Sequence, residues 1–296
     1  MNAPSQQIRF QPTVDPILEE YRKRGYAVLR NVIDPAVIAA LDEASLPVFA
    51  RTPFSKGSFY GERTKRFLGL LKHMPGIAAL VQHQLILKLA TQILDECDSI
   101  QLNSTQAIEV HPGALPQPPH RDQVVWHERS DEFDFVVSVA CPFNDYSAHV
   151  GTTRIWPSTH LYREGAYDVG RDPVDIEMGP GDALLFSGRV MHGQGTNESN
   201  RIRRGIIFSY SLGWLKPFEN MMLTYPPAVA RRFPPGLAEL IGYRMQRPNL
   251  GSVGGKCPSI LLQGEAGEIG GLGFNDMFTP ELARRVEAFH DAMRAA

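Results

Sequence analysis

Two histidines and an aspartate are the residues of this chain best suited to hold a metal ion. His120 and Asp122 lie in the segment 117–122 (QPPHRD), where the prolines favour an extended backbone. Side chains two residues apart on an extended segment point to the same side, so this pair can reach one ion. With a second imidazole, the pair would form the two-histidine, one-carboxylate face that binds non-haem Fe(II) and leaves further coordination positions open.

His192 is the best candidate for the second imidazole, because it follows a predicted strand at 183–186 that a barrel could return beside His120. His127 lies close to the first pair in the chain and is the rival candidate. A histidine and an aspartate at this spacing also occur by chance on exposed surfaces, so the pair alone does not establish a metal site. The remaining histidines have no comparable partner pattern: His73, His83, His111, His149, His160 and His290.

A cluster of arginines follows His192 and offers a binding group for an anion. Arg201, Arg203 and Arg204 stand just before a predicted strand at 205–212. Arginine presents a planar fork that binds a carboxylate through two hydrogen bonds. If the strand has begun there, Arg203 and Arg204 point to opposite faces, so at most one of them enters the interior. The same cluster is also typical of a basic turn exposed to water.

The composition is that of an ordinary globular protein and excludes several classes. The chain has 296 residues, of which 43% are hydrophobic and 21% charged, with a formal net charge of −2 and a pI near 6.5. This balance argues against a broad nucleic-acid-binding face. No apolar stretch of about 18 residues suggests a membrane helix, and the N-terminus lacks the apolar core of a signal peptide. The three cysteines form no CxxC pair and suggest no zinc site, and reduced thiols in a cytoplasmic protein are expected.

The pattern of elements predicts a mainly β fold with flanking α-helices, arranged as a single domain over residues 1–296. Helices are expected over about 1–98, a strand-rich core over about 99–215, and helices and loops over about 216–296. The short, turn-separated strands are typical of a sandwich or barrel. Strands are expected at 26–29, 100–110, 133–140, 183–186 and 205–212, and helices at about 15–24, 34–45, 77–94, 237–243 and 280–294.

Two local signals set boundaries within this pattern. Pro47 should end the second helix near Ser45, because the residue before a proline avoids helical geometry. Residues 250–273 are rich in glycine and are expected to form a mobile loop.

Several segments between about residues 103 and 212, taken in order, resemble the phytanoyl-CoA dioxygenase family of Fe(II)/2-oxoglutarate-dependent oxygenases. The helix and strand near the N-terminus also resemble the opening of that family. No single motif is decisive, and the specificity lies in the ordered set. The matching segments are 117–122 (QPPHRD), 151–160 (GTTRIWPSTH), 180–186 (PGDALLF) and 192–197 (HGQGTN), followed by Arg203.

The resemblance implies a double-stranded β-helix, which is a jelly-roll barrel of the cupin type. It implies that His120, Asp122 and His192 hold Fe(II). Arg203, eleven residues after His192, matches the arginine that binds the distal carboxylate of 2-oxoglutarate in the family, and Arg204 is the alternative. O2 is the other cosubstrate.

Further residues are assigned only through the resemblance. Gln117 and Thr153 match positions that contact the cosubstrate, and Asp182 matches a structural turn before a barrel strand. The sequence departs from the family around Thr153, because Val150-Gly151 replaces Asn-Gly and 157–160 (PSTH) replaces Pro-Gly-Ser-His. These departures bear on the assignment of Thr153 more than on the metal ligands.

The implied reaction is oxidation of an unactivated C–H bond, with 2-oxoglutarate converted to succinate and carbon dioxide. Hydroxylation is expected, and the sequence does not separate it from desaturation, epoxidation or rearrangement. Asp122 fills the position that related halogenases leave free for chloride, which favours hydroxylase-type chemistry. The segments 213–220 and 240–243 resemble the branch that acts on terpenoids and related natural products, so the expected substrate is small and largely apolar. Members of that branch are often dimeric, so a homodimer is also expected.

Four aromatic residues are expected to line the substrate pocket, although aromatic residues in a barrel more often belong to its core. They are Phe59, Trp126, Phe135 and Trp214.

Two other functions are compatible with the barrel, because a fold does not fix a function. A non-catalytic jelly-roll protein that binds a ligand or metal would be expected to lack a metal ligand or the arginine. A metal-dependent isomerase or hydrolase using the same three ligands would not need Arg203 and would not consume 2-oxoglutarate.

Overall fold

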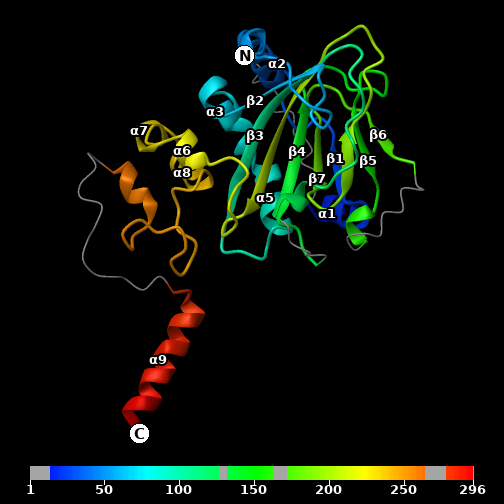
Figure 1. The fold of residues 1–296 in the computed structure, drawn as a ribbon. Helices are drawn as coiled ribbons and strands as arrows, with labels where there is room; N and C mark the ends of the chain where they lie inside the picture. Colours follow the sequence, from blue (N-terminus) through cyan, green and yellow to red (C-terminus); the bar gives the residue numbers. More distant parts are fainter. Residues whose placement is uncertain (1–13, 127–131, 163–171, 264–277, 296) are drawn as a thin grey trace, which may run out of the picture.

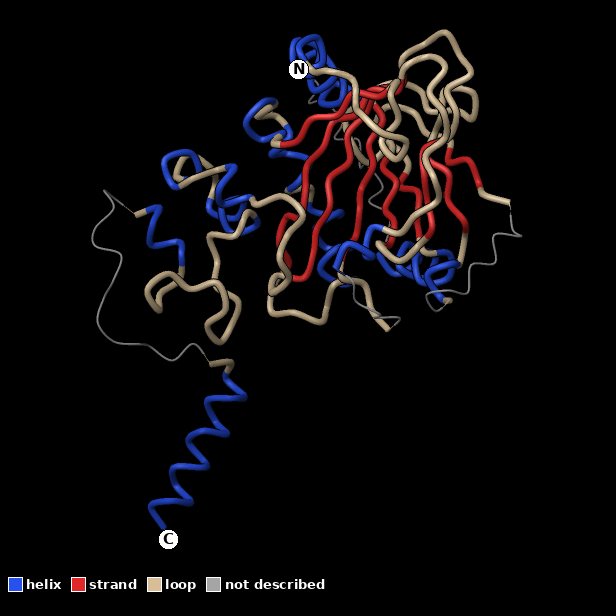
Figure 2. Tube along the Cα trace, viewed as in Figure 1, coloured by secondary structure: helices blue, strands red, loops and turns tan. Residues whose placement is uncertain are grey.

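A computed structural model describes residues 14–126, 132–162, 172–263 and 278–295. A large antiparallel sheet forms the centre of the molecule, with a smaller sheet on one side of it and helices on the other (Figures 1 and 2). The fold is therefore the mainly β arrangement with flanking helices that the sequence predicts. None of the helices in the described part of the chain is long and apolar enough to cross a membrane.

The large sheet has six strands in the order β1-β7-β4-β9-β3-β2, and every neighbouring pair is antiparallel. The small sheet has three strands in the order β6-β5-β8. Strands far apart in the sequence are neighbours in both sheets, which is typical of a jelly roll. The bounds are β1 Tyr26–Leu29, β2 Thr64–Leu68, β3 Ile100–Val110, β4 Val136–Pro142, β5 Thr153–Trp156, β6 Val174–Ile176, β7 Ala183–Ser187, β8 Met191–Gln194 and β9 Arg203–Leu212.

The alternation of side chains along the strands separates two hydrophobic layers. On β9, Ile206, Phe208 and Tyr210 pack toward the helices, whereas Ile207 and Ser209 face the barrel interior. A second cluster lies between the two sheets and fixes their separation. It consists of Tyr26, Ala140, Tyr146, Ile155, Ile176, Met178, Leu184, Phe186 and Val190.

Amphipathic helices cover the outer face of the large sheet and bury its apolar side chains. The C-terminal helix α9 is different, because it buries none of its residues and extends away from the rest of the chain (Figure 1). The bounds are α1 Val14–Arg24, α2 Pro35–Arg51, α3 Leu70–His73, α4 Ile77–Val81, α5 Gln84–Ile93, α6 Met221–Thr224, α7 Pro227–Ala230, α8 Pro235–Leu240 and α9 Pro280–Ala295.

The expected end of the second helix at Pro47 is wrong. Helix α2 continues through Pro47 to Arg51, with Val48 and Phe49 buried beneath it. The Phe49 ring lies 4.9 Å from the Phe67 ring of β2, in an edge-to-face contact. Burial of two large side chains against the sheet therefore offsets the hydrogen bond that proline cannot make, which costs about 3 kcal/mol in an isolated helix.

Other boundaries differ in smaller ways. The expected helix at 77–94 is two helices, α4 and α5, and the strands β2, β5, β6 and β8 have no counterpart among the predicted elements. Of the expected loop at 250–273, residues 250–263 contain two isolated bridges and a short 3-10 helix, Pro258–Leu262, and residues 264–273 lie outside the described part. Asp182 has the structural role expected, since its carboxylate accepts hydrogen bonds from the backbone of Asn31 and Gly179 and from Arg30.

Candidate metal centre and cosubstrate pocket

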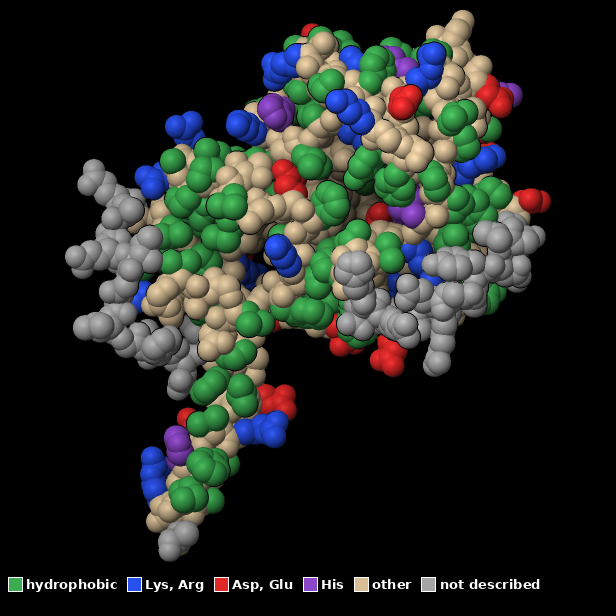
Figure 3. Space-filling model, viewed as in Figure 1, with side chains coloured by type: hydrophobic (Ala, Val, Ile, Leu, Met, Phe, Trp, Pro, Cys, Tyr) green, Lys and Arg blue, Asp and Glu red, His purple; other side chains and the backbone are tan. Residues whose placement is uncertain are grey.

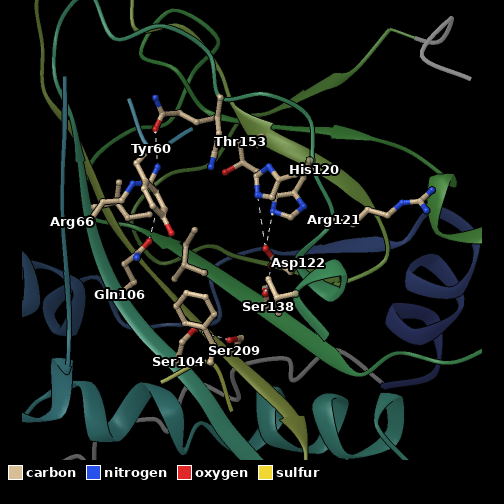
Figure 4. A pocket seen from close by; sticks show the side chains of 18 of the residues that line it. Tyr60, Arg66, Ser104, Gln106, His120, Arg121, Asp122, Ser138, Thr153 and Ser209 are labelled. Carbon is tan, nitrogen blue, oxygen red and sulfur yellow. Dashed lines mark hydrogen bonds and ion pairs between the residues drawn. The ribbon is translucent and has the colours of Figure 1, made fainter. Parts of the chain in front are cut away.

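His120, Asp122 and His192 come together at one end of the barrel interior (Figure 4). Their ligand atoms all lie within 4.8 Å of one another. Asp122 Oδ1 is 3.9 Å from Nε2 of His120 and 3.6 Å from Nε2 of His192. The rival candidate His127 lies outside the described residues.

Backbone pairing brings the two histidines together. His120 and His192 form an isolated antiparallel bridge, in which each N–H donates to the other's carbonyl at 2.9 Å. The segment before His120 is extended as predicted, but Asp122 begins a 3-10 helix, Asp122–Trp126, rather than continuing as a strand. The turn still directs the carboxylate toward the two imidazoles.

The backbone also fixes which ring nitrogens face the centre. Nδ1 of His120 lies 3.0 Å from the carbonyl of Pro118, and Nδ1 of His192 lies 3.1 Å from the carbonyl of Val190. Each Nδ1 must carry a proton to make that bond, which leaves Nε2 as the nitrogen that faces Asp122. In the neutral ring with this tautomer, Nε2 has the lone pair that binds a metal.

The electrostatics of His120 favour the same form. Burial, helped by the neighbouring His192, lowers the pKa of His120 to about 4, although Asp122 acts in the opposite direction. The ring is therefore neutral at neutral pH. Two imidazoles and one carboxylate suit a divalent first-row metal such as Fe(II).

Ser138 on β4 orients the carboxylate. Its hydroxyl donates to Asp122 Oδ2 at 2.9 Å, which leaves Oδ1 as the oxygen nearest both imidazoles. A carboxylate held in this way presents one oxygen to a metal and keeps other coordination positions open.

We expect Ser138→Ala to weaken Fe(II) binding about ten-fold, because loss of a group that orients a metal ligand typically costs 10- to 100-fold. The dissociation constant can be measured by competition with a chromophoric chelator. Ser138→Thr keeps the hydroxyl and should restore most of the affinity. An unchanged dissociation constant in Ser138→Ala would show that the hydrogen bond does not position Asp122.

Arg203 provides a buried cation in the same cavity. It is the first residue of β9 and is only 3% exposed, with its guanidinium carbon 4.3 Å from the centre of the Tyr146 ring. Gly205, two residues along the same face, leaves the space for that ring, since a Cβ there would lie 2.1 Å from the Tyr146 hydroxyl. Arg204 points the other way and pairs with Asp42 at 2.7 and 3.0 Å. The alternation predicted for these two arginines is confirmed.

Arg66 is a second, partly buried cation that the sequence analysis did not single out. It lies on the edge strand β2, opposite Ile108 of β3, and lines the cavity (Figure 4). Burial and the charge of Arg203 lower its pKa to about 10, so it remains protonated at neutral pH. Gln106 and Gln194 accept hydrogen bonds from it at 3.1 and 3.4 Å. The signal in the sequence is weak: Thr64, Arg66 and Leu68 are two residues apart and would share one face if this segment were a strand.

The two arginines are suited to an anionic ligand. Nε of Arg66 and Nε of Arg203 are buried and have no hydrogen-bond partner among the described residues. Two cations with unpaired donors in one cavity reduce the stability of the fold unless an anion accepts their hydrogen bonds and balances their charge. Gln117 and Thr153, both predicted to contact a cosubstrate, also line the cavity. A dicarboxylate that reaches from the metal to Arg203 fits this donor set.

The cavity encloses about 260 Å³. Of the aromatic residues expected in it, Phe59 and Trp126 are among its lining residues, and the Phe59 ring lies 4.9 Å from that of His120. The expectation for Phe135 and Trp214 needs correction, because neither lines the cavity. Phe135 is buried in the core beneath the helices, with Trp214 packed edge-on at 6.1 Å. Phe135 comes directly before β4 and points to the same side as Val137 and Val139 of that strand, which is the side that packs against the helices and not the cavity.

Residues 21–205 match the family described as phytanoyl-CoA dioxygenase (PhyH). The chain belongs to this family. It is accordingly a non-haem iron, 2-oxoglutarate-dependent dioxygenase, with Fe(II) and 2-oxoglutarate as its cofactors.

Curated relatives carry names of the same kind. "Dioxygenase FrzG" from Cladobotryum sp is 27% identical, over 86% of this chain and 91% of that protein. "Multifunctional dioxygenase ausE" from Emericella nidulans is 26% identical, over 81% of this chain and 88% of that protein. Among solved structures, the non-heme alpha ketoglutarate dependent epimerase SnoN from nogalamycin biosynthesis has a TM-score of 0.58 at 17% identity, covering 68% of this chain and 83% of SnoN. This likeness supports the jelly-roll fold.

Proposed function

We propose that this dioxygenase oxidises an unactivated C–H bond of a small, largely apolar natural product such as a terpenoid. The observation that carries the proposal is a cavity that joins three groups: the metal triad, the arginine pair Arg66 and Arg203, and a mostly apolar wall. Similar solved structures come from the biosynthesis of nogalamycin, which supports a natural product as the substrate. Asp122 fills the carboxylate position of the triad, which favours hydroxylase-type chemistry over halogenation; desaturation, epoxidation and rearrangement are alternative outcomes of the same C–H oxidation.

The residues divide the work. His120, Asp122 and His192 would hold Fe(II), and Arg203 would bind the distal carboxylate of 2-oxoglutarate with help from Gln117 and Thr153. When bound, iron and 2-oxoglutarate supply the oxidising power, and succinate and carbon dioxide are the coproducts. The protein's part is to fix the geometry of these groups and to exclude water around the C–H bond that reacts.

The substrate side of the cavity is apolar. The apolar residues that line the cavity include Leu68, Val124, Val125, Trp126 and Phe218. The cations that the cavity contains, Arg66 and Arg203, lie on the cosubstrate side, while Arg121 points away from it and donates to the carbonyl of Thr159 (Figure 4). This distribution favours a neutral hydrocarbon-rich substrate over an acyl-CoA.

The test is an anaerobic titration of the Fe(II)-loaded protein with 2-oxoglutarate. A visible metal-to-ligand charge-transfer band is expected, followed by 2-oxoglutarate-dependent succinate formation when O2 and a substrate mixture are added. A metal-dependent isomerase or hydrolase with the same ligands would bind iron but show neither the band nor succinate. That result would reject the proposal.

We also propose that the active form is a homodimer in which α9 packs against a second copy. The helix buries no residue of its own, and Phe289 and Met293 on it are each 62% exposed. Hydrophobic side chains run along this helix in Figure 3. An exposed apolar stripe of this kind typically marks an interface.

Light scattering measures the mass in solution. The full chain is expected to have about twice the mass of a single chain, and Phe289→Glu/Met293→Glu is expected to be monomeric because it places charge in the contact. Glu287→Gln, on the same helix, is the matched control and should remain dimeric. A monomeric full chain would contradict the proposal.

A further inference from the structure

Three serines form a row across the large sheet on the face that lines the cavity. Ser104 of β3 is directly opposite Ser209 of β9, and Ser209 is directly opposite Ser138 of β4. All three line the cavity. Ser138 donates to Asp122, so one end of the row is at the metal centre (Figure 4). The other two serines take no part in holding the metal or the cosubstrate.

A β-bulge in β3 adds a further polar side chain, Asn103, at the end of the row that is away from Ser138. The register of β3 against β9 shifts between Leu102 and Ser104, so Asn103 is an extra residue with no partner on β9. Bulges near active sites commonly redirect a side chain. Here the shift lets both Asn103 and Ser104 reach the same hydroxyl, because Asn103 Nδ2 donates to Ser209 Oγ at 3.0 Å and Ser104 Oγ lies 2.9 Å from Ser209 Oγ.

The hydrogen bonds among Asn103, Ser104 and Ser209 leave one serine hydroxyl proton without an acceptor in the described residues. Ser209 accepts from Asn103, and one of the two serine protons is used between Ser104 and Ser209. The other serine proton has no acceptor among the described residues. Asn103 is itself held, since its Oδ1 accepts from the backbone N–H of Phe218 at 2.7 Å. The pair of hydroxyls therefore presents a positioned O–H donor to the cavity.

The surroundings of this donor exclude the cosubstrate as its partner. Figure 4 shows Ser104 and Ser209 on the opposite side of the cavity from Thr153 and Tyr60. The apolar Phe218 and Leu68 belong to the same cavity. Ser104 is only partly buried, so water can accept from this donor while the cavity holds no ligand. An apolar ligand that displaces this water loses the hydrogen bond unless it carries its own acceptor atom there.

We infer that Ser104 and Ser209, supported by Asn103, form the binding site for one oxygen of the substrate, either a ketone or a hydroxyl, on a hydrocarbon ring system. This inference rests on the proposed function. Neighbouring strands lie about 5 Å apart, so the oxygen sits about 5–10 Å along the row from Ser138. By holding this oxygen, the serines would determine which carbon of the substrate lies near the metal centre. That carbon is remote from the one that carries the oxygen.

The test uses camphor, borneol and bornane, which are the ketone, the alcohol and the hydrocarbon of one bicyclic skeleton. Binding to the protein loaded with Fe(II) and 2-oxoglutarate is measured without O2, by equilibrium dialysis and gas chromatography. Ser104→Ala/Ser209→Ala is expected to weaken the binding of camphor and borneol about five-fold and to leave bornane within about two-fold, as for loss of one neutral hydrogen bond. Asn103 is left unchanged because it also holds the backbone of Phe218.

Ser211→Ala is the matched control. Ser211 is on the same strand and is fully buried, but it does not line the cavity and its hydroxyl has no partner among the described residues. It should change none of the three affinities. Equal weakening of all three probes by the double variant, no weakening of any, or failure of both camphor and borneol to bind the unmodified protein would overturn the inference. The charge-transfer band is read in the same samples, so its absence would instead reject the proposed function.

Discussion

His192→Ala is expected to lower the affinity for Fe(II) by at least about 100-fold and to abolish the charge-transfer band with 2-oxoglutarate. The variant removes one of three donors whose ligand atoms lie within 4.8 Å of one another. It removes more than a group that merely orients a ligand, for which losses of 10- to 100-fold are typical. The backbone bridge to His120 does not depend on the imidazole, so the fold should survive.

Iron content after gel filtration and the chelator-competition constant measure this effect independently of activity. His111→Ala is a suitable control, because His111 is partly buried and pairs with Glu109 rather than with the triad. It should bind iron normally. Stoichiometric, tight iron in His192→Ala would show that the metal lies elsewhere in the chain.

Arg203→Ala and Arg204→Ala form a second test with a large expected difference. Arg203→Ala should raise the dissociation constant for 2-oxoglutarate about 100-fold, because a buried, charge-assisted contact with a carboxylate is lost. Arg204→Ala removes a partly exposed ion pair with Asp42, worth roughly 0–1 kcal/mol of stability, and should change the constant less than two-fold. The two variants of adjacent arginines are thus expected to differ greatly in their dissociation constants for 2-oxoglutarate.

Titration of the charge-transfer band measures both constants. Arg66→Ala is expected to fall between the two variants, since Arg66 contributes charge to the same end of the cavity. Equal effects of Arg203→Ala and Arg204→Ala would contradict the assignment of Arg203. A larger effect of Arg66→Ala than of Arg203→Ala would make Arg66 the principal carboxylate-binding residue.

The sequence was sufficient for the parts of the site that local geometry controls. The extended segment at His120 predicted that His120 and Asp122 point to the same side, and the period of two along β9 predicted that at most one of Arg203 and Arg204 faces inward. The choice of Arg203 came from the resemblance to the family, through its spacing from His192. The same period, applied to β4, would have placed Phe135 with Val137 on the helix side and Ser138 on the cavity side.

Other features depend on partners that are distant in the chain. Arg66 looks like an ordinary basic residue until β2 pairs with β3, and nothing local gives that register. Helix α2 passes through Pro47 because Phe49 meets Phe67 in the folded protein. The serine row likewise exists only through pairing of β3, β9 and β4.

The two sheets carry different ends of the site. His192 comes from β8 of the small sheet, and Arg203 comes from β9 of the large sheet. The span between metal and guanidinium is therefore a property of how the sheets pack, through the cluster around Ile155 and Phe186. The packing of the two sheets is therefore expected to determine which length of keto diacid fits between the metal centre and Arg203. A substitution of Ile155, which belongs to this cluster and does not line the cavity, is expected to change the ratio of dissociation constants for oxaloacetate and 2-oxoglutarate, which competition against the charge-transfer band can measure.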